Sequence, residues 1–316
     1  MAGVHILNSG MLSTIQDLGR FCYMSTGFSP SGAMDGFALQ LANILVGNAP
    51  GDGAVEMTAM GMTVRFDCAC AIALTGGDMS PKLNSEPIPM NQTVAVQAED
   101  VLSCGFVQKG MRTYLAVSGG FDLPMIMGSM STNLKCGLGG FQGRALKKGD
   151  VLPLRYEISA DMVGTYRFQP EDYMDGPLTL RVILGPQEDM FTDEGIRTFL
   201  SQVYKVSEQS DRMGVRLDGP KIENKNGVDI ISDGIATGAV QIPSAGTPII
   251  MMADRQTTGG YAKIATVISA DLKRIAQAKP GTALRFRGVT MQEALKLKKE
   301  EQTALRRLEY RICISK

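Results

Sequence analysis

The feature that most constrains the fold of this chain is a series of short apolar runs that end near glycine. In residues 63–67 and 93–97 apolar side chains alternate with polar ones, which is the period of a strand with one buried face. Residues 114–117 and 249–252 are apolar throughout, which is typical of strands buried on both faces. Glycine supplies 36 of 316 residues without a regular period. We therefore expect a mainly β protein with many tight turns and a few helices.

Apolar residues at helical spacing are confined to a few stretches. Asp35 is a candidate N-cap for one helix, and Thr192 precedes a second. A third helix is expected over residues 271–277. The final stretch differs in kind, because Thr290 and Glu293 form a capping box ahead of a segment rich in Lys, Glu, Arg and Leu. We expect one long charged helix there.

A length of 316 residues suits two lobes or one large β-rich domain. Between residues 155 and 177 the chain turns polar and loses its strand signals, so a boundary is expected there. A G-x-x-L-x-apolar-R motif closes each half, at 149–155 and 281–287, which favours two related β-barrel-like lobes. The expected parts are a first lobe over 1–165, a second lobe over 166–288 and a C-terminal helix over 289–316.

The charge balance argues against several kinds of partner. Lys and Arg together number 32, as do Asp and Glu, so bulk charge does not favour nucleic acid or an anionic membrane. His5 is the only histidine, which excludes multi-histidine zinc sites and histidine-paired nucleophiles within this chain. No secretory signal is visible, no apolar run is long enough to span a bilayer, and the cysteines form no C-x-x-C pair. We expect a cytoplasmic protein with reduced cysteines.

The densest run of polar residues directly follows the apolar strand at 248–253. Residues 254–263 place a carboxylate, a guanidinium, an amide, two hydroxyls, a phenol and an amine at one strand end. Two adjacent glycines there would let a ligand approach the backbone closely. Such a set suits a small carboxylate, ureido or lactam substrate, with Arg255 as a bidentate donor. The alternative is a polar turn in which Asp254 and Arg255 pair with each other.

Two further segments join this candidate site. Asp211 and Arg212 lie between a hydroxyl and a glycine, where an internal ion pair is the alternative to a functional role. Gln241 lies in an apolar strand and needs a polar partner, from the protein or from a substrate. We expect the loops around 211, 241 and 254–263 to meet in one crevice. The candidate catalytic residues are Asp254, Asp211 and Arg255; the candidate substrate-binding residues are Gln241, Arg212, Gln256, Thr257, Thr258, Gly259, Gly260, Tyr261 and Lys263; no metal ligand is expected.

Several motifs occur along the chain in the order of a known family. They include TIQDLGR at 14–20, SGAMD at 31–35, GGFQGRALKKGD at 139–150, SDRMGVRLDGP at 210–220 and DRQTTGGYAKIATVISADL at 254–272. By these motifs the chain resembles the family known as allophanate hydrolase subunit 2, as KipA, or as the C subunit of 5-oxoprolinase. The resemblance implies two cyclophilin-like β-barrel lobes, similar to the carboxyltransferase part of biotin-dependent urea carboxylase. The sequence departs from the family pattern at Cys22, Val215 and Ala262, and only at Val215 would an aromatic contact be lost.

The resemblance implies three alternative functions, which we rank in order. First, the chain is the C subunit of a bacterial ATP-dependent 5-oxoprolinase, a hydrolase that opens 5-oxoproline to glutamate. Its partners are then the KipI-like B subunit of 5-oxoprolinase and the A subunit, and ATP acts through the complex, with no P-loop motif or other ATP site evident in this chain. Second, it transfers a carboxyl group from biotin on another chain to urea or a small amide. Third, it is a non-catalytic KipA-like regulator that binds a kinase inhibitor.

Overall fold

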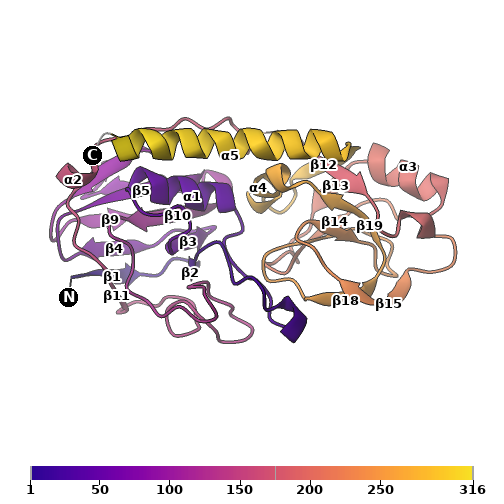
Figure 1. Cartoon of the computed structure of the whole chain (residues 1–316), viewed down its shortest axis with the longest axis horizontal. Helices are drawn as coiled ribbons and strands as arrows, with labels where there is room; N and C mark the ends of the chain where they lie inside the picture. Colours follow the sequence, from indigo (N-terminus) through magenta and orange to yellow (C-terminus); the bar gives the residue numbers. More distant parts are fainter. Residues whose placement is uncertain (1, 175, 315–316) are drawn as a thin grey trace. The chain divides into compact units, whose positions relative to one another are not determined.

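A computed structural model describes residues 2–174 and 176–314 (Figure 1). Its contacts divide the chain into two compact units. Unit 1 comprises Met1–Phe21, Ser31–Asp172 and Gln302–Lys316, and unit 2 comprises Cys22–Pro30 and Tyr173–Glu301. A short segment near the N-terminus therefore groups with strands that lie far along the chain. The boundaries expected at 165 and 288 divide the chain into independently folding parts, and this division remains a prediction.

Unit 1 contains two antiparallel sheets that share one hydrophobic core. Because side chains alternate along a strand, one face of each sheet is apolar: Val4 and Ile6 from one sheet and Ile72 and Leu74 from the other are all buried in this core. The six-stranded sheet has the order β11-β1-β4-β9-β6-β7, with β1 Gly3–Asn8, β4 Thr63–Phe66, β6 Lys82–Leu83, β7 Glu86–Pro87, β9 Val101–Ser103 and β11 Val151–Pro153. The five-stranded sheet has the order β2-β3-β10-β5-β8, with β2 Leu12–Gln16, β3 Ala54–Thr58, β5 Cys70–Asp78, β8 Thr93–Val96 and β10 Lys109–Val117.

Unit 2 is built on a closed barrel of seven strands. Phe286 of its last strand is buried, stacked on Phe199 with ring centroids 4.3 Å apart and tilted against Tyr204. The barrel has the order β12-β19-β16-β17-β14-β13-β20, with β12 Leu178–Leu184, β13 Tyr204–Val206, β14 Gly214–Asp218, β16 Ala239–Gln241, β17 Ile249–Met251, β19 Lys263–Val267 and β20 Ala283–Gly288. A separate two-stranded ribbon pairs β15 Asp229–Gly234 with β18 Thr258–Tyr261. Closure removes the open sheet edges that would otherwise be left without hydrogen bonds.

The predicted helix starts are confirmed at the level of single hydrogen bonds. The Asp35 carboxylate accepts from the Ala38 N–H at the start of α1 (Gly36–Leu45), and the Thr192 hydroxyl accepts from Gly195 N–H at the start of α3 (Asp193–Ser201). The Thr290 hydroxyl accepts from Glu293 N–H in the first turn of α5 (Met291–Ile314). The remaining helical turns are α2 Ala160–Val163, α4 Leu272–Ala276 and the 3-10 turns η1 Met24–Thr26, η2 Glu188–Met190 and η3 Ser269–Asp271.

These elements confirm the mainly β fold class with a few helices and a long C-terminal helix. Helix α5 buries Leu305, Leu308 and Ile312 on one face and carries most of its charged residues elsewhere, as its sequence predicted. Over the described residues, every helix is either too short or too polar to cross a bilayer.

Candidate functional site

All the predicted site residues belong to unit 2, where short barrel strands and the ribbon bring several of them together. In the antiparallel pair of β14 and β17, Gly214 lies opposite Met251, so the loops that carry Arg212 and Asp254 are neighbours. In the pair of β16 and β19, Gln241 lies opposite Lys263. Residues that are far apart along the chain therefore become adjacent through strand register alone.

Arg212 and Asp254 form a buried ion pair. The Arg212 Nε donates to the Asp254 carboxylate at 2.9 Å, and Nη2 lies 3.4 Å from its other oxygen. Both side chains are less than 10% exposed, and the Asp254 N–H donates to the Arg212 carbonyl at 2.9 Å. The interpretation that Asp254 pairs with Arg255 is therefore wrong, because its carboxylate bonds to the other arginine.

Asp211 has a different environment from Asp254. It faces solvent, and its Oδ1 accepts from the N–H groups of Met213 at 2.7 Å and Gly214 at 3.1 Å. An aspartate that accepts from the N–H two residues ahead is typical of a tight turn. The local contacts of Asp211 thus close its own loop and do not join the Arg212–Asp254 pair.

Arg255 is buried without a carboxylate in the described part of the chain. Only 4% of the residue is exposed, and its Nε donates to the Ile235 carbonyl at 2.8 Å. Its terminal nitrogens lie 3.4 Å from the Met252 carbonyl and 3.8 Å from the Met24 sulfur, which are both uncharged. Burial lowers the pKa of Arg255 to about 10, because the charged form loses its hydration. A buried cation with neutral partners is the arrangement that an anionic ligand would complete.

Gln241 is a second incompletely bonded buried group of unit 2. It is 4% exposed, and its amide nitrogen has no hydrogen-bond partner within the described residues. A Cβ at Gly259 would lie 2.9 Å from this nitrogen and 2.7 Å from the end of the Ile235 side chain, so a larger residue there would displace one of these side-chain ends. Ile235 thus links the two groups, since its carbonyl bonds to Arg255 and its side chain lies against the Gly259 position. The single open crevice stays a prediction.

The other predicted residues lie along the ribbon and differ in exposure. Gln256, Thr258 and Tyr261 are exposed, whereas Thr257 and Gly260 are partly buried. The Thr257 carbonyl accepts from the Ile235 N–H at 3.0 Å, which ties this segment to the loop before β16. The exposed side chains of Gln256, Thr258 and Tyr261 offer hydrogen-bonding groups to solvent, whereas those of Arg255 and Gln241 are buried.

Lys263 and Asp233 join the ribbon to the barrel. Lys263 is buried, and its ammonium lies 2.9 Å from the Asp233 carboxylate, which is half exposed. The hydrogen bond from Lys263 and, to a smaller extent, that from the Gly234 N–H hold the pKa of Asp233 below its ordinary value. This stabilising contribution is present above the ordinary carboxyl pKa and is lost as the pH falls through the lowered pKa.

Replacement of Lys263 by methionine is therefore expected to raise the pKa of Asp233 toward its ordinary value. The direction follows because Lys263 supplies the largest of the favourable interactions with the ionised form. An NMR titration of the Asp233 carboxyl carbon measures this change. Gln187→Ala is the matched control, since the Gln187 amide lies 3.5 Å from the same carboxylate and should shift the pKa less. An identical Asp233 pKa in Lys263→Met and the parent protein would contradict the assignment.

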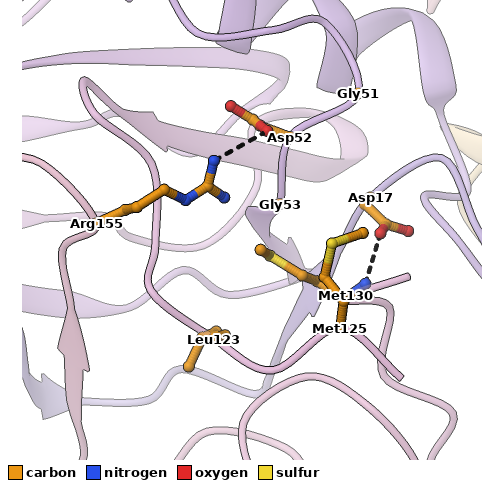
Figure 2. A pocket seen from close by; sticks show the side chains of 8 residues that line it. All are labelled: Asp17, Gly51, Asp52, Gly53, Leu123, Met125, Met130 and Arg155. Atoms are coloured by element: carbon orange, nitrogen blue, oxygen red, sulfur yellow. Dashed lines mark hydrogen bonds and ion pairs between the residues drawn. The ribbon is translucent and has the colours of Figure 1, made fainter. Parts of the chain in front are cut away.

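Unit 1 contains a pocket that the sequence did not predict. Its volume is about 250 Å³, and Figure 2 shows the Arg155 guanidinium pointing toward Asp52 within it. The closest atoms of that ion pair are 3.6 Å apart, so each group retains hydrogen-bonding capacity. The pocket is lined by Asp17, Gly51, Asp52, Gly53, Leu123, Met125, Met130 and Arg155.

Asp17 shapes this pocket rather than offering free acceptors to a ligand. Its carboxylate accepts from the N–H groups of Gly19 and Met130 and from the hydroxyls of Ser129 and Ser131. The only sequence signals for the pocket were the TIQDLGR motif, which by itself is typical of a cap and turn, and the arginine that ends the first G-x-x-L-x-apolar-R motif. Chemically, the pocket offers one guanidinium and one incompletely paired carboxylate beside an apolar wall.

Comparison with known proteins identifies relatives of this chain. The family model for the carboxyltransferase domain, subdomain A and B, matches residues 26–288. The C subunit of 5-oxoprolinase from Escherichia coli is 37% identical over 307 residues, which cover 97% of this chain and 98% of that protein. Urea amidolyase from Lachancea kluyveri is 33% identical, over 96% of this chain and 18% of its own length. The crystal structure of urea carboxylase from Kluyveromyces lactis superposes with a TM-score of 0.89 at 30% identity, over 97% of this chain and 29% of that one.

Proposed function

Because this chain belongs to the carboxyltransferase family of subdomains A and B, we propose that it is the C subunit of an ATP-dependent 5-oxoprolinase. The observation that carries the proposal is the similarity to the Escherichia coli protein of that name, which extends over 98% of that protein's length. The proposed complex hydrolyses the lactam of 5-oxoproline, so that water adds to the carbonyl carbon, the ring C–N bond breaks and glutamate is released.

In this proposal the buried donors of unit 2 bind the substrate. Arg255 binds its negative charge or the oxygen of its lactam carbonyl, because it is a desolvated cation with only neutral partners. Gln241 donates a second hydrogen bond through the amide nitrogen that lacks a partner within the described residues. Donors that are already oriented in a buried site stabilise developing charge on oxygen more than donors in water do.

Of the two candidate carboxylates, Asp254 is the better placed. It directly precedes Arg255 in the chain, and its pairing with Arg212 holds it in one orientation. Asp211 is instead occupied by its own turn and exposed to solvent. We therefore assign Asp254 the role of orienting a water molecule or a proton at the bound lactam. The exposed side chains of the ribbon form the outer part of the site. ATP and the A and B subunits supply the other requirements of the reaction.

A second candidate function is carboxyl transfer from biotin on another chain to urea or a small amide. The similarity to urea carboxylase supports it, since that structure superposes on nearly the whole chain. The same donors, Arg255 and Gln241, suit a urea carbonyl. The two functions differ in what they require, because only carboxyl transfer consumes bicarbonate and needs a biotinylated partner.

Coexpression with the bacterial A and B subunits of 5-oxoprolinase tests the proposal directly. We expect the purified complex to form glutamate from 5-oxoproline only when ATP and this chain are both present. Preparations that each lack one of the three proteins are the controls. Turnover that depends on bicarbonate and on a partner retained by avidin would favour carboxyl transfer instead. A complex that assembles but shows neither reaction would contradict both and leave a regulatory role.

A further inference from the structure

One edge of the Arg255 guanidinium lacks a strong acceptor. Its Nε is held by the Ile235 carbonyl at 2.8 Å, but the two terminal nitrogens face the Met252 carbonyl at 3.4 Å and the Met24 sulfur at 3.8 Å. Hydrogen bonds from N–H to oxygen are usually about 2.7–3.2 Å long, and a thioether is a weak acceptor. An arginine presents two parallel N–H groups on such an edge, which is the geometry that a carboxylate accepts.

Met24 contacts this edge from a segment that is only lightly attached to the barrel. Within the described residues, the backbone N–H groups of Thr26 and Phe28 both donate to the Tyr23 carbonyl, and that of Gly27 donates to the Met24 carbonyl. Apart from the sulfur contact, the hydrogen bonds of residues 23–28 thus close within the segment. Few hydrogen bonds to neighbouring elements make a segment able to open at low free-energy cost.

The end of the segment is anchored near the same site. The Ser29 hydroxyl donates to the Ala253 carbonyl at 3.2 Å, directly before Asp254. Residues 22–30 also group with unit 2 by their contacts. Tyr23 and Phe28 are each 37% exposed, so solvent reaches the outer face of the segment. Ser29 therefore anchors the segment to the loop that carries Asp254 and Arg255.

We propose that Met24 is a removable cover of a carboxylate-binding site at Arg255, and that it sets which ligands enter. The inference rests on the proposed role of Arg255 in substrate binding. A small carboxylate displaces the Met24 sulfur and takes both terminal N–H groups. A neutral ligand offers the buried cation no charge in exchange and does not displace the cover. Met24 thus makes the site select anionic substrates.

Three substitutions at Met24 test this in the full chain. Met24→Glu places a tethered carboxylate at the same edge, so it should raise the midpoint of thermal unfolding by about 2–4 °C and weaken binding of 5-oxoproline about tenfold or more. Met24→Gln is the matched neutral control and should do neither. Met24→Ala removes the cover and should strengthen binding about three- to tenfold, since less of the protein must rearrange before the ligand enters.

Calorimetric titration with 5-oxoproline and with 2-pyrrolidone, the same lactam without its carboxylate, provides the ligand comparison. We expect measurable binding of 5-oxoproline alone, and loss of that difference in Met24→Glu. Equal unfolding midpoints and equal affinities for Met24→Glu and Met24→Gln would overturn the inference, as would equal binding of the two lactams by the parent chain. If the complex turns over 5-oxoproline but these midpoints and affinities are equal, the proposed function is supported and the role of Met24 is wrong. If binding is as expected but the complex shows no turnover, the carboxylate site is supported and the proposed function is wrong.

Discussion

Replacement of Arg255 by methionine is expected to reduce glutamate formation by the reconstituted complex about a hundredfold or more while the chain stays folded. The activity falls because the buried cation that binds the substrate is lost, and removal of one partner of a buried, hydrogen-bonded charge pair costs about 2–5 kcal/mol of binding free energy. Stability is maintained because Arg255 has no carboxylate partner in the described chain, so an apolar side chain of similar length removes a desolvated charge. Steady-state glutamate production and thermal unfolding of the same preparations measure both effects.

A loss of activity without a loss of stability would identify Arg255 as a ligand-binding residue. An arginine with only a structural role would lose stability and activity together, whereas a ligand-binding arginine loses activity alone. Arg255→Lys is the conservative control, and it should recover little activity because an ammonium cannot form the bidentate contact. Full turnover by Arg255→Met would exclude Arg255 from the site.

Asp254→Ala is expected to have the largest effect on stability. The substitution removes the Asp254 carboxylate from its buried ion pair with Arg212, and loss of one partner of a buried ion pair costs about 3–5 kcal/mol. Because the pair joins the loops next to β14 and β17, amide hydrogen exchange should rise most strongly in these two strands. Exchange measured across the whole chain localises the change to unit 2, which a single melting temperature would not do.

The double variant Arg212→Met with Asp254→Leu is the control for this prediction. If the loss comes from an uncompensated buried charge, replacement of both partners by apolar side chains should restore about half or more of the protection lost in Asp254→Ala. Activity should stay low in both variants, since each lacks the Asp254 carboxylate. Unchanged exchange in Asp254→Ala would show that the pair does not hold the loops together.

Features that depend on neighbouring residues were predicted well. The caps at Asp35, Thr192 and Thr290 each join side chain and backbone within a few positions, so the sequence contains both partners of each bond. The strands at 63–66 and 93–96 follow from their alternation in the same way. The family resemblance is confirmed by the match over residues 26–288.

Features that depend on strand register were not predictable. The alternative in which Asp254 pairs with its chain neighbour Arg255 is wrong, because the opposition of Gly214 and Met251 in the barrel places Asp254 beside Arg212. The contact of Met24 with Arg255 joins residues far apart in sequence, and no local pattern indicates it. The pocket between Asp52 and Arg155 was missed for the same reason.

By itself, the sequence determined the mainly β class, the helix ends, the segments that carry the polar side chains and the membership of the family. Periodicity and capping are properties of a few adjacent residues, so they can be read along the chain. Only the tertiary structure decided that the buried Arg212 pairs with Asp254, whereas the buried Arg255 meets only uncharged acceptors. Closure of the barrel determines which strands pair, and strand pairing determines which side chains lie next to each buried charge.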